Sequence, residues 1–140
     1  MSKIAVVFWS GTGNTEAMAK SVASGAVAAG AEVDILTASE FDAAKVAEYD
    51  AIAFGCPAMG SEQLEEEEFE PMFELCKLAL KGRRIALFGS YGWGDGEWMR
   101  SWEASARGCG AELACESVIC TDAPDEEAAA KCEALGRALV

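Results

Sequence analysis

Short, uninterrupted apolar runs that alternate with helical patterns constrain the fold of this chain more than any other feature. Residues 4–9, 51–56 and 85–89 are continuous and apolar, as is typical of strands covered on both faces. Residues 32–35 alternate between polar and apolar, and residues 112–119 are apolar with polar interruptions, so both segments suit the edges of a sheet.

Helical patterns separate these strands and each keeps one apolar face. The first runs from Glu16 to Ala29 and can end at Gly30, and Pro71 is expected in the first turn of another. The helix expected near residues 42–48 has the weakest pattern. The faces that we expect to be buried are those of Ala19, Val22, Ala23, Ala26 and Val27; of Met72, Phe73, Leu75, Cys76 and Leu80; of Trp98, Met99, Trp102 and Ala106; and of Ala128, Cys132, Leu135 and Leu139.

Five strand–helix repeats without a linker predict one α/β domain over residues 1–140. Right-handed crossovers then give a doubly wound, five-stranded parallel sheet with helices on both faces. With 140 residues, of which 51% are hydrophobic, the chain is large enough to bury such a sheet.

The charge balance is strongly acidic and excludes several kinds of partner. Asp and Glu number 24 against 11 Lys and Arg, a formal net charge of −13. Nucleic acid and anionic membranes would be repelled, whereas a protein with a basic surface would be attracted. Alternatively, the acidity serves only to keep the protein in solution. No apolar run reaches the roughly 18 residues of a membrane span, and the N-terminus lacks the layout of a signal peptide, so we expect a cytoplasmic protein.

Six cysteines occur without a Cys-x-x-Cys pair and without any histidine in the chain. This pattern does not favour a zinc or iron–sulfur site. We therefore expect reduced thiols that pack as small hydrophobic side chains, and no metal. The missing histidine also removes the most common general base.

The segment Ser10-Gly11-Thr12-Gly13-Asn14-Thr15 joins the first strand to the first helix. Backbone N–H groups and the helix N-terminus make such a turn a good anion site. No Lys or Arg lies between Lys3 and Lys20, so a bound phosphate would meet neutral donors only. The loop therefore favours a phosphate that anchors a ligand over one that is transferred, and a nucleotide hydrolase fails for want of the loop lysine.

Two further loops follow the third and fourth strands and should lie at the same sheet edge. They read Pro57-Ala58-Met59-Gly60-Ser61-Glu62 and Ser90-Tyr91-Gly92-Trp93-Gly94-Asp95-Gly96. Met59 taken alone could fill a gap in the core. Trp93 between two glycines needs something to pack against. Taken together, the three loops indicate a ligand with a phosphate and a distant aromatic ring.

These three loops, with the continuation Glu97-Trp98-Met99, closely resemble those of the short-chain flavodoxins of anaerobic bacteria, and the resemblance covers the whole chain. It implies the strand order 2-1-3-4-5 and non-covalently bound FMN at the switch point between the first and third strands. It also implies a low-potential one-electron carrier, not an enzyme, that shuttles between oxidised, neutral semiquinone and anionic hydroquinone FMN. Its partners would be reductases or oxidoreductases with basic docking surfaces, and the protein itself a monomer.

The resemblance also implies roles for individual residues. Side chains and N–H groups of the first loop would hold the phosphate, Met59 and Trp93 would lie against the two ring faces, and Glu62 would meet the pyrimidine edge. The Gly60-Ser61 peptide would turn over on one-electron reduction. The expected FMN contacts are Ser10, Gly11, Thr12, Gly13, Asn14, Thr15, Ala58, Met59, Gly60, Ser61, Glu62, Ser90, Tyr91, Gly92, Trp93, Gly94 and Asp95.

Seven glutamates and no basic residue lie between residues 62 and 74. Their field would disfavour a reduced flavin anion and would guide a basic partner, although a solvated surface is the simpler interpretation of residues 65–68. The main functional alternative is an FMN-dependent NAD(P)H:quinone reductase, which needs an open flavin face that Trp93 would cover. A phosphorylated receiver needs acids after the first strand and an aspartate after the third, where this chain has Ser10 and Cys56.

Overall fold

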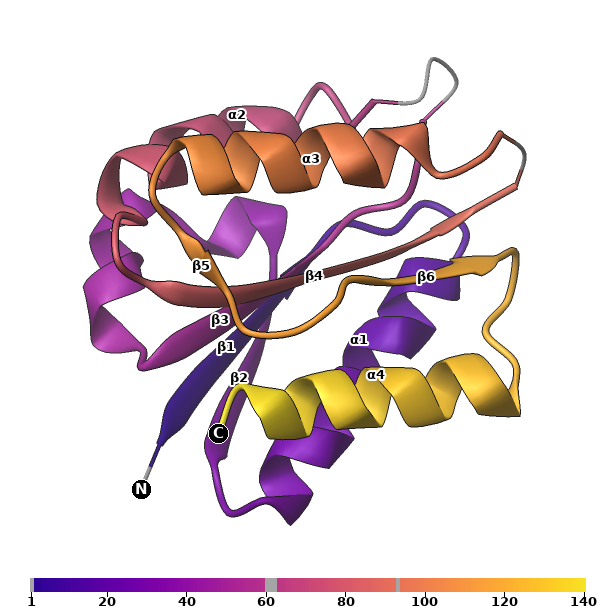
Figure 1. The fold of residues 1–140 in the computed structure, drawn as a ribbon, viewed down its shortest axis with the longest axis horizontal. Coiled ribbons are helices and arrows are strands. Elements are labelled where there is room, and N and C mark those ends of the chain that lie inside the picture. Colours follow the sequence, from indigo (N-terminus) through magenta and orange to yellow (C-terminus); the bar gives the residue numbers. More distant parts are fainter. Residues whose placement is uncertain (1, 60–62, 93) are drawn as a thin grey trace.

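A computed structural model describes residues 2–59, 63–92 and 94–140 as a parallel sheet between two helical layers (Figure 1). The sheet order is β2-β1-β3-β4, with β5 and β6 both on the far side of β4, and every pair is parallel. The strands are β1 (Lys3–Phe8), β2 (Glu32–Thr37), β3 (Ala51–Gly55), β4 (Arg84–Tyr91), β5 (Glu112–Leu113) and β6 (Val118–Thr121). The predicted order and doubly wound architecture are confirmed.

The fifth position of the sheet differs from the single strand expected over residues 112–119. It is split into β5 and β6, and the second piece reaches Thr121. The polar interruption explains the split, because the Ser117 hydroxyl turns away to donate to Glu103 Oε2 at 2.7 Å. Ala114 still donates its N–H to Ile85 O at 2.8 Å, so the segment stays against β4 between the two pieces.

Helices α1 (Asn14–Ala28) and α4 (Glu126–Ala138) cover one face of the sheet, and α2 (Phe69–Cys76) and α3 (Glu97–Gly108) cover the other (Figure 1). The weak helix expected near residues 42–48 is a 3₁₀ helix, Ala43–Glu48. Two further 3₁₀ turns occupy Ala38–Glu40 and Lys77–Ala79. Each face of the sheet carries its own cluster of buried apolar side chains.

The predicted apolar faces are buried with two exceptions. Val27 is 57% exposed and Leu75 is 59% exposed, so both predictions were wrong. Each lies next to a buried residue on its helix. Helical periodicity alone does not show which residues at the edge of an apolar face are buried and which are exposed. Pro71 lies in the first turn of α2, and Gly30 follows α1 with a φ of 98°, as the sequence indicated.

Helices α1 and α4 cross in close backbone contact at two glycines. A Cβ atom on Gly25 would lie 2.0 Å from Glu133 O, and one on Gly136 would lie 2.0 Å from Val22 O. A side chain at either position would therefore push the helices apart. This crossing fixes α1, and with it the helix N-terminus at the sheet edge.

All six cysteines are free thiols. Cys109, Cys115 and Cys120 are only partly buried, whereas Cys56, Cys76 and Cys132 are buried, as expected of small core side chains. Burial raises the pKa of each of these three thiols to about 12. Among the described residues, no helix is both long and apolar enough to span a membrane.

Candidate functional site

The loops after β1, β3 and β4 meet at the carboxyl edge of the sheet, as predicted. The N–H of Trp9 donates to Gly55 O at 3.0 Å, and the N–H of Ala58 donates to Ser90 O at 3.0 Å. The N–H of Asp122 then donates to Tyr91 O at 2.8 Å. A continuous set of backbone hydrogen bonds therefore joins all three loops and the end of β6.

The first loop is shaped to receive an anion. Gly13 has a φ of 94°, a conformation that glycine adopts without strain, and its N–H donates to Ser10 Oγ at 3.0 Å. Helix α1 begins directly after Gly13 without a side-chain cap from the described residues. Its first-turn N–H groups are thus available to a ligand, and the helix dipole favours a negative one. A neutral donor set of this kind fits a permanently bound phosphate group.

Thr15 connects the first loop to the third. Its Oγ1 lies 3.1 Å from Ser90 Oγ, and both residues are buried. The hydroxyl pair sets the distance between the start of α1 and the end of β4. Two of the predicted site residues are therefore held together inside the protein.

Trp9, the last residue of the first apolar run, packs against the first loop. A Cβ on Gly11 would lie 3.0 Å from the Trp9 ring, so the ring covers the Gly11 backbone. Any larger residue at position 11 would have to displace the indole. Trp9 thus supports the loop from one side.

The second loop is closed at its base by the N–H of Met59, which donates to Gln63 O at 2.9 Å. Met59 is partly exposed. The predicted site residues Gly60, Ser61 and Glu62 lie outside the described residues, as does Trp93 of the third loop. Cys56 precedes the second loop, and its sulfur accepts the N–H of Glu65 at 3.4 Å and donates to Pro57 O at 3.5 Å.

Glu65 differs from its acidic neighbours in being buried, with 5% of its surface exposed. Its carboxylate accepts the N–H groups of Glu67, Glu68 and Phe69 at 2.7 to 2.8 Å, so it caps the start of α2. Burial would raise the pKa of Glu65, but the N–H bonds from Phe69, Glu68 and Glu67 outweigh it, and the pKa lies below its usual value.

Sequence reasoning missed this role because it treated residues 65–68 as one acidic surface. The available signal was an acid four residues before the helix start at Phe69, in a segment whose proline at 71 already marked a first turn.

The third loop is anchored by two aromatic rings. The Tyr91 and Trp98 ring centroids are 5.3 Å apart, and Trp98 Nε1 donates to Cys56 O at 3.2 Å. Trp98 therefore ties the loop after β4 to the end of β3. Near the end of the loop, Asp95 is exposed and pairs with Arg100 at 3.1 Å.

Asp122, directly after β6, lies beside the third loop. It has a φ of 56°, the only non-glycine residue with positive φ in the described chain. Its Oδ1 would lie 3.6 Å from a Cβ placed on Gly92. A strained residue in contact with a predicted binding loop is typical of a functional site.

The sheet order reverses between β1 and β3, and the helix N-terminus that suits an anion lies at this switch point with two more loops beside it. This arrangement defines an α/β protein of the flavin- or nucleotide-binding class. Comparison with known proteins identifies it further. The sequence profile described as flavodoxin matches residues 6–136. The chain belongs to the flavodoxin family.

Individual relatives agree with this assignment. The flavodoxin of Megasphaera elsdenii is 44% identical over 135 residues, 96% of each chain, and that of Clostridium beijerinckii is 44% identical over 121 residues, 86% of this chain and 88% of the relative. The solution structure of two-electron reduced Megasphaera elsdenii flavodoxin matches with a TM-score of 0.90 and 44% identity over 97% of both chains. An archaeal flavodoxin structure matches with a TM-score of 0.86 and 26% identity, covering 98% of this chain and 95% of that one.

The protein is therefore an FMN-binding electron carrier that exchanges electrons with redox partner proteins, and not an enzyme. The predicted cofactor and function are confirmed. The alternative of a quinone reductase is not favoured.

Proposed function

We propose that the FMN phosphate binds at the N-terminus of α1, held by Ser10, Gly11, Thr12, Gly13, Asn14 and Thr15. The observation that supports this assignment best is the start of α1 itself. Gly13 turns the chain through positive φ, and the helix begins there with its first N–H groups uncapped by a side chain. Because no basic residue lies in the loop, the phosphate remains a tether.

We place the flavin ring between the second and third loops. A backbone hydrogen bond joins Ala58 to Ser90, so the two loops leave the sheet edge side by side. Further ring contacts are assigned to Met59, Tyr91, Gly92, Gly94 and Asp95, and to the loop residues Gly60, Ser61, Glu62 and Trp93 by the sequence pattern alone. The protein supplies orientation and electrostatics, and the bound flavin supplies the one-electron chemistry.

The remaining features of the proposal concern the whole chain. Residues 1–140 act as one FMN-binding unit and a monomer of low potential, because the acidic surroundings oppose negative charge on the flavin. The net charge of −13 favours redox partners with basic docking surfaces. Six free thiols suit a reducing compartment, and we place the protein in the cytoplasm.

The phosphate assignment is tested by comparing FMN with riboflavin, which lacks the phosphate. In Ser10→Ala, a donor to the phosphate is lost, and we expect FMN binding to the apoprotein to weaken by about ten- to a hundredfold. Riboflavin binding should change little. Ser24→Ala, on the exposed side of α1 and away from its N-terminus, is the matched control. Equal effects on FMN and riboflavin would show that the phosphate binds elsewhere.

A further inference from the structure

A groove of about 200 Å³ runs between α2 and α3, next to the second loop. Its aromatic lining residues are Phe73, Trp98 and Trp102. Since Trp98 also contacts Tyr91 and Cys56 O, the groove shares one wall with the candidate flavin site. A group bound in the groove would therefore lie close to the loops that we assign to the flavin.

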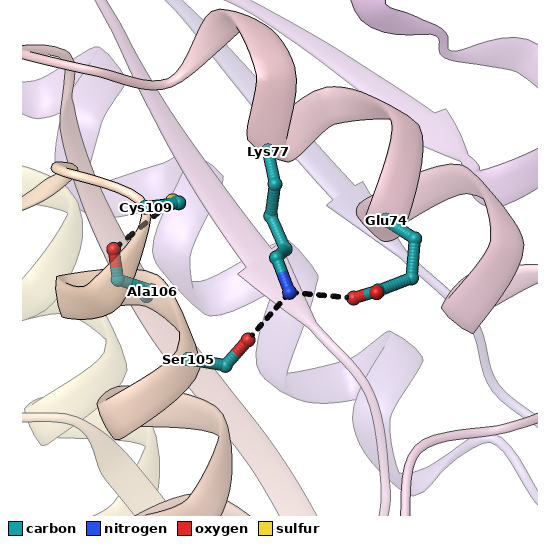
Figure 2. A network of polar contacts seen from close by, with 5 residues as sticks. All are labelled: Glu74, Lys77, Ser105, Ala106 and Cys109. Atoms are coloured by element: carbon teal, nitrogen blue, oxygen red, sulfur yellow. Dashed lines mark hydrogen bonds and ion pairs between the residues drawn. The ribbon is translucent and has the colours of Figure 1, made fainter.

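One end of the groove already holds an ammonium group. Lys77 Nζ lies 2.9 Å from Glu74 Oε2 on α2 and 2.9 Å from Ser105 Oγ on α3 (Figure 2). Both Glu74 and Ser105 line the groove. A carboxylate from one helix and a hydroxyl from the other thus form a pair that binds a lysine.

The same pair of residue types recurs one helical turn nearer the second loop, as Glu70 on α2 and Ser101 on α3. Both line the groove, and residues four apart lie on one helix face. Lys77 follows Glu74 by three residues, whereas Phe73 occupies the corresponding place after Glu70. Within the described residues, the Glu70 carboxylate and the Ser101 hydroxyl make no hydrogen bond. Glu70 and Ser101 therefore offer the same carboxylate and hydroxyl as Glu74 and Ser105, but no lysine of this chain binds between them.

Trp102 provides independent evidence that the groove binds a group with a hydrogen-bond acceptor. Its Nε1 is buried without a hydrogen-bond partner, the one such side-chain atom in the part of the chain described. Trp102 is 2% exposed and lines the groove. A buried donor without an acceptor costs stability unless a ligand or solvent supplies one.

We propose that this groove is a docking subsite for a lysine side chain on the redox partner. The lysine ammonium lies between Glu70 and Ser101, and its methylene groups lie on Phe73 and the indole rings, where a cation–π contact adds to the binding. In the complex, a carbonyl oxygen of the partner accepts from Trp102 Nε1. This inference rests on the proposed basic partner and specifies where one of its cations binds.

The test uses the FMN-loaded protein labelled with ¹⁵N and three short peptides. The probes are acetyl-Gly-Lys-Gly-amide, its arginine analogue, and its norleucine analogue, which has the methylene groups without the charge. We expect the lysine peptide to shift the indole N–H resonances of Trp98 and Trp102 in a saturable way. Norleucine should shift them less, and Glu70→Gln should weaken lysine binding about two- to fivefold.

Glu66→Gln is the matched control, because it removes the same charge from an exposed position outside the groove. The proposal is overturned if both variants bind the lysine peptide equally well, if norleucine binds as well as lysine, or if arginine is preferred. It is also overturned if the Trp98 and Trp102 signals do not respond. The visible flavin spectrum, recorded for each variant, keeps this outcome distinct from a loss of FMN binding.

Discussion

Glu65, whose carboxylate caps the start of α2, offers a direct test of how a buried acid stabilises this fold. In Glu65→Gln, one carboxylate oxygen becomes an NH₂ group, which is a donor. The two oxygens of Glu65 now accept three N–H groups: those of Glu68 and Phe69 bind Oε1, and that of Glu67 binds Oε2. The glutamine side chain can keep the two hydrogen bonds to its carbonyl oxygen. Its NH₂ group, which is itself a donor, then faces the N–H of Glu67 and cannot accept from it.

Losing one charge-assisted hydrogen bond of this kind costs about 1.5–3 kcal/mol. We therefore expect the free energy of unfolding to fall by that amount at pH 7. Urea unfolding should be measured at a fixed concentration of free FMN, because ligand binding itself adds to stability. The exposed Glu66→Gln removes the same charge without a cap and should stay within about 0.5 kcal/mol of the wild type.

The pH dependence gives a second check on the same residue. The pKa of Glu65 is lower in the folded protein than its ordinary value of 4.5. A lowered folded pKa means that the stabilisation is complete above the unfolded pKa and is lost as pH falls through the folded pKa. The difference between wild type and Glu65→Gln should thus be constant near pH 7 and shrink below about pH 4.5. A difference that is already absent at pH 7 would refute the cap.

Three other predictions follow from packing, burial and charge. Gly136→Ala should lower the free energy of unfolding by about 1–3 kcal/mol through overpacking against α1, whereas Gly108→Ala, which meets nothing within 4 Å, should raise it by about 0.5 kcal/mol in urea titrations. Burial raises the pKa of Cys56 to about 12, so a thiol reagent at pH 8 should modify it only after unfolding, and fast modification of the native protein would contradict its burial. Electron transfer to a basic partner should slow as ionic strength rises, and a flat stopped-flow profile would contradict docking by charge.

The central strands of the sheet can be predicted from the sequence, because a strand that is buried on both faces is a continuous run of apolar residues. The apolar run at 85–89 has no polar residue, and in the strand that contains it every residue except the two end residues, Arg84 and Tyr91, is buried. The edges are less predictable because half of each strand contacts solvent. At the fifth position, a few polar residues decide between one strand and two, and one of them, Ser117, bonds to Glu103 in a contact that the pattern of polar and apolar residues does not show.

Long-range contacts also limited what the sequence could say about the site. The hydroxyl of Thr15 was predicted to face a phosphate, but its link to Ser90 joins residues 75 positions apart and has no local signature. Asp122 likewise lies against Gly92 of another loop, whereas Trp9 covers Gly11, a near neighbour in the sequence. The residue types indicated a flavin site, and the tertiary contacts determine which residues support it.

The acidic segment from residue 62 to residue 74 shows why charge counted along a sequence overstates the field at a site. The negative charge of Glu65 is compensated by three N–H dipoles, and that of Glu74 by Lys77. Glu66, Glu67, Glu68 and Glu70 have no ion pair among the described residues, and their charges act most directly on a partner. We therefore expect changes at Glu65 to alter stability and changes at Glu70 to alter docking, although both residues belong to the same acidic run.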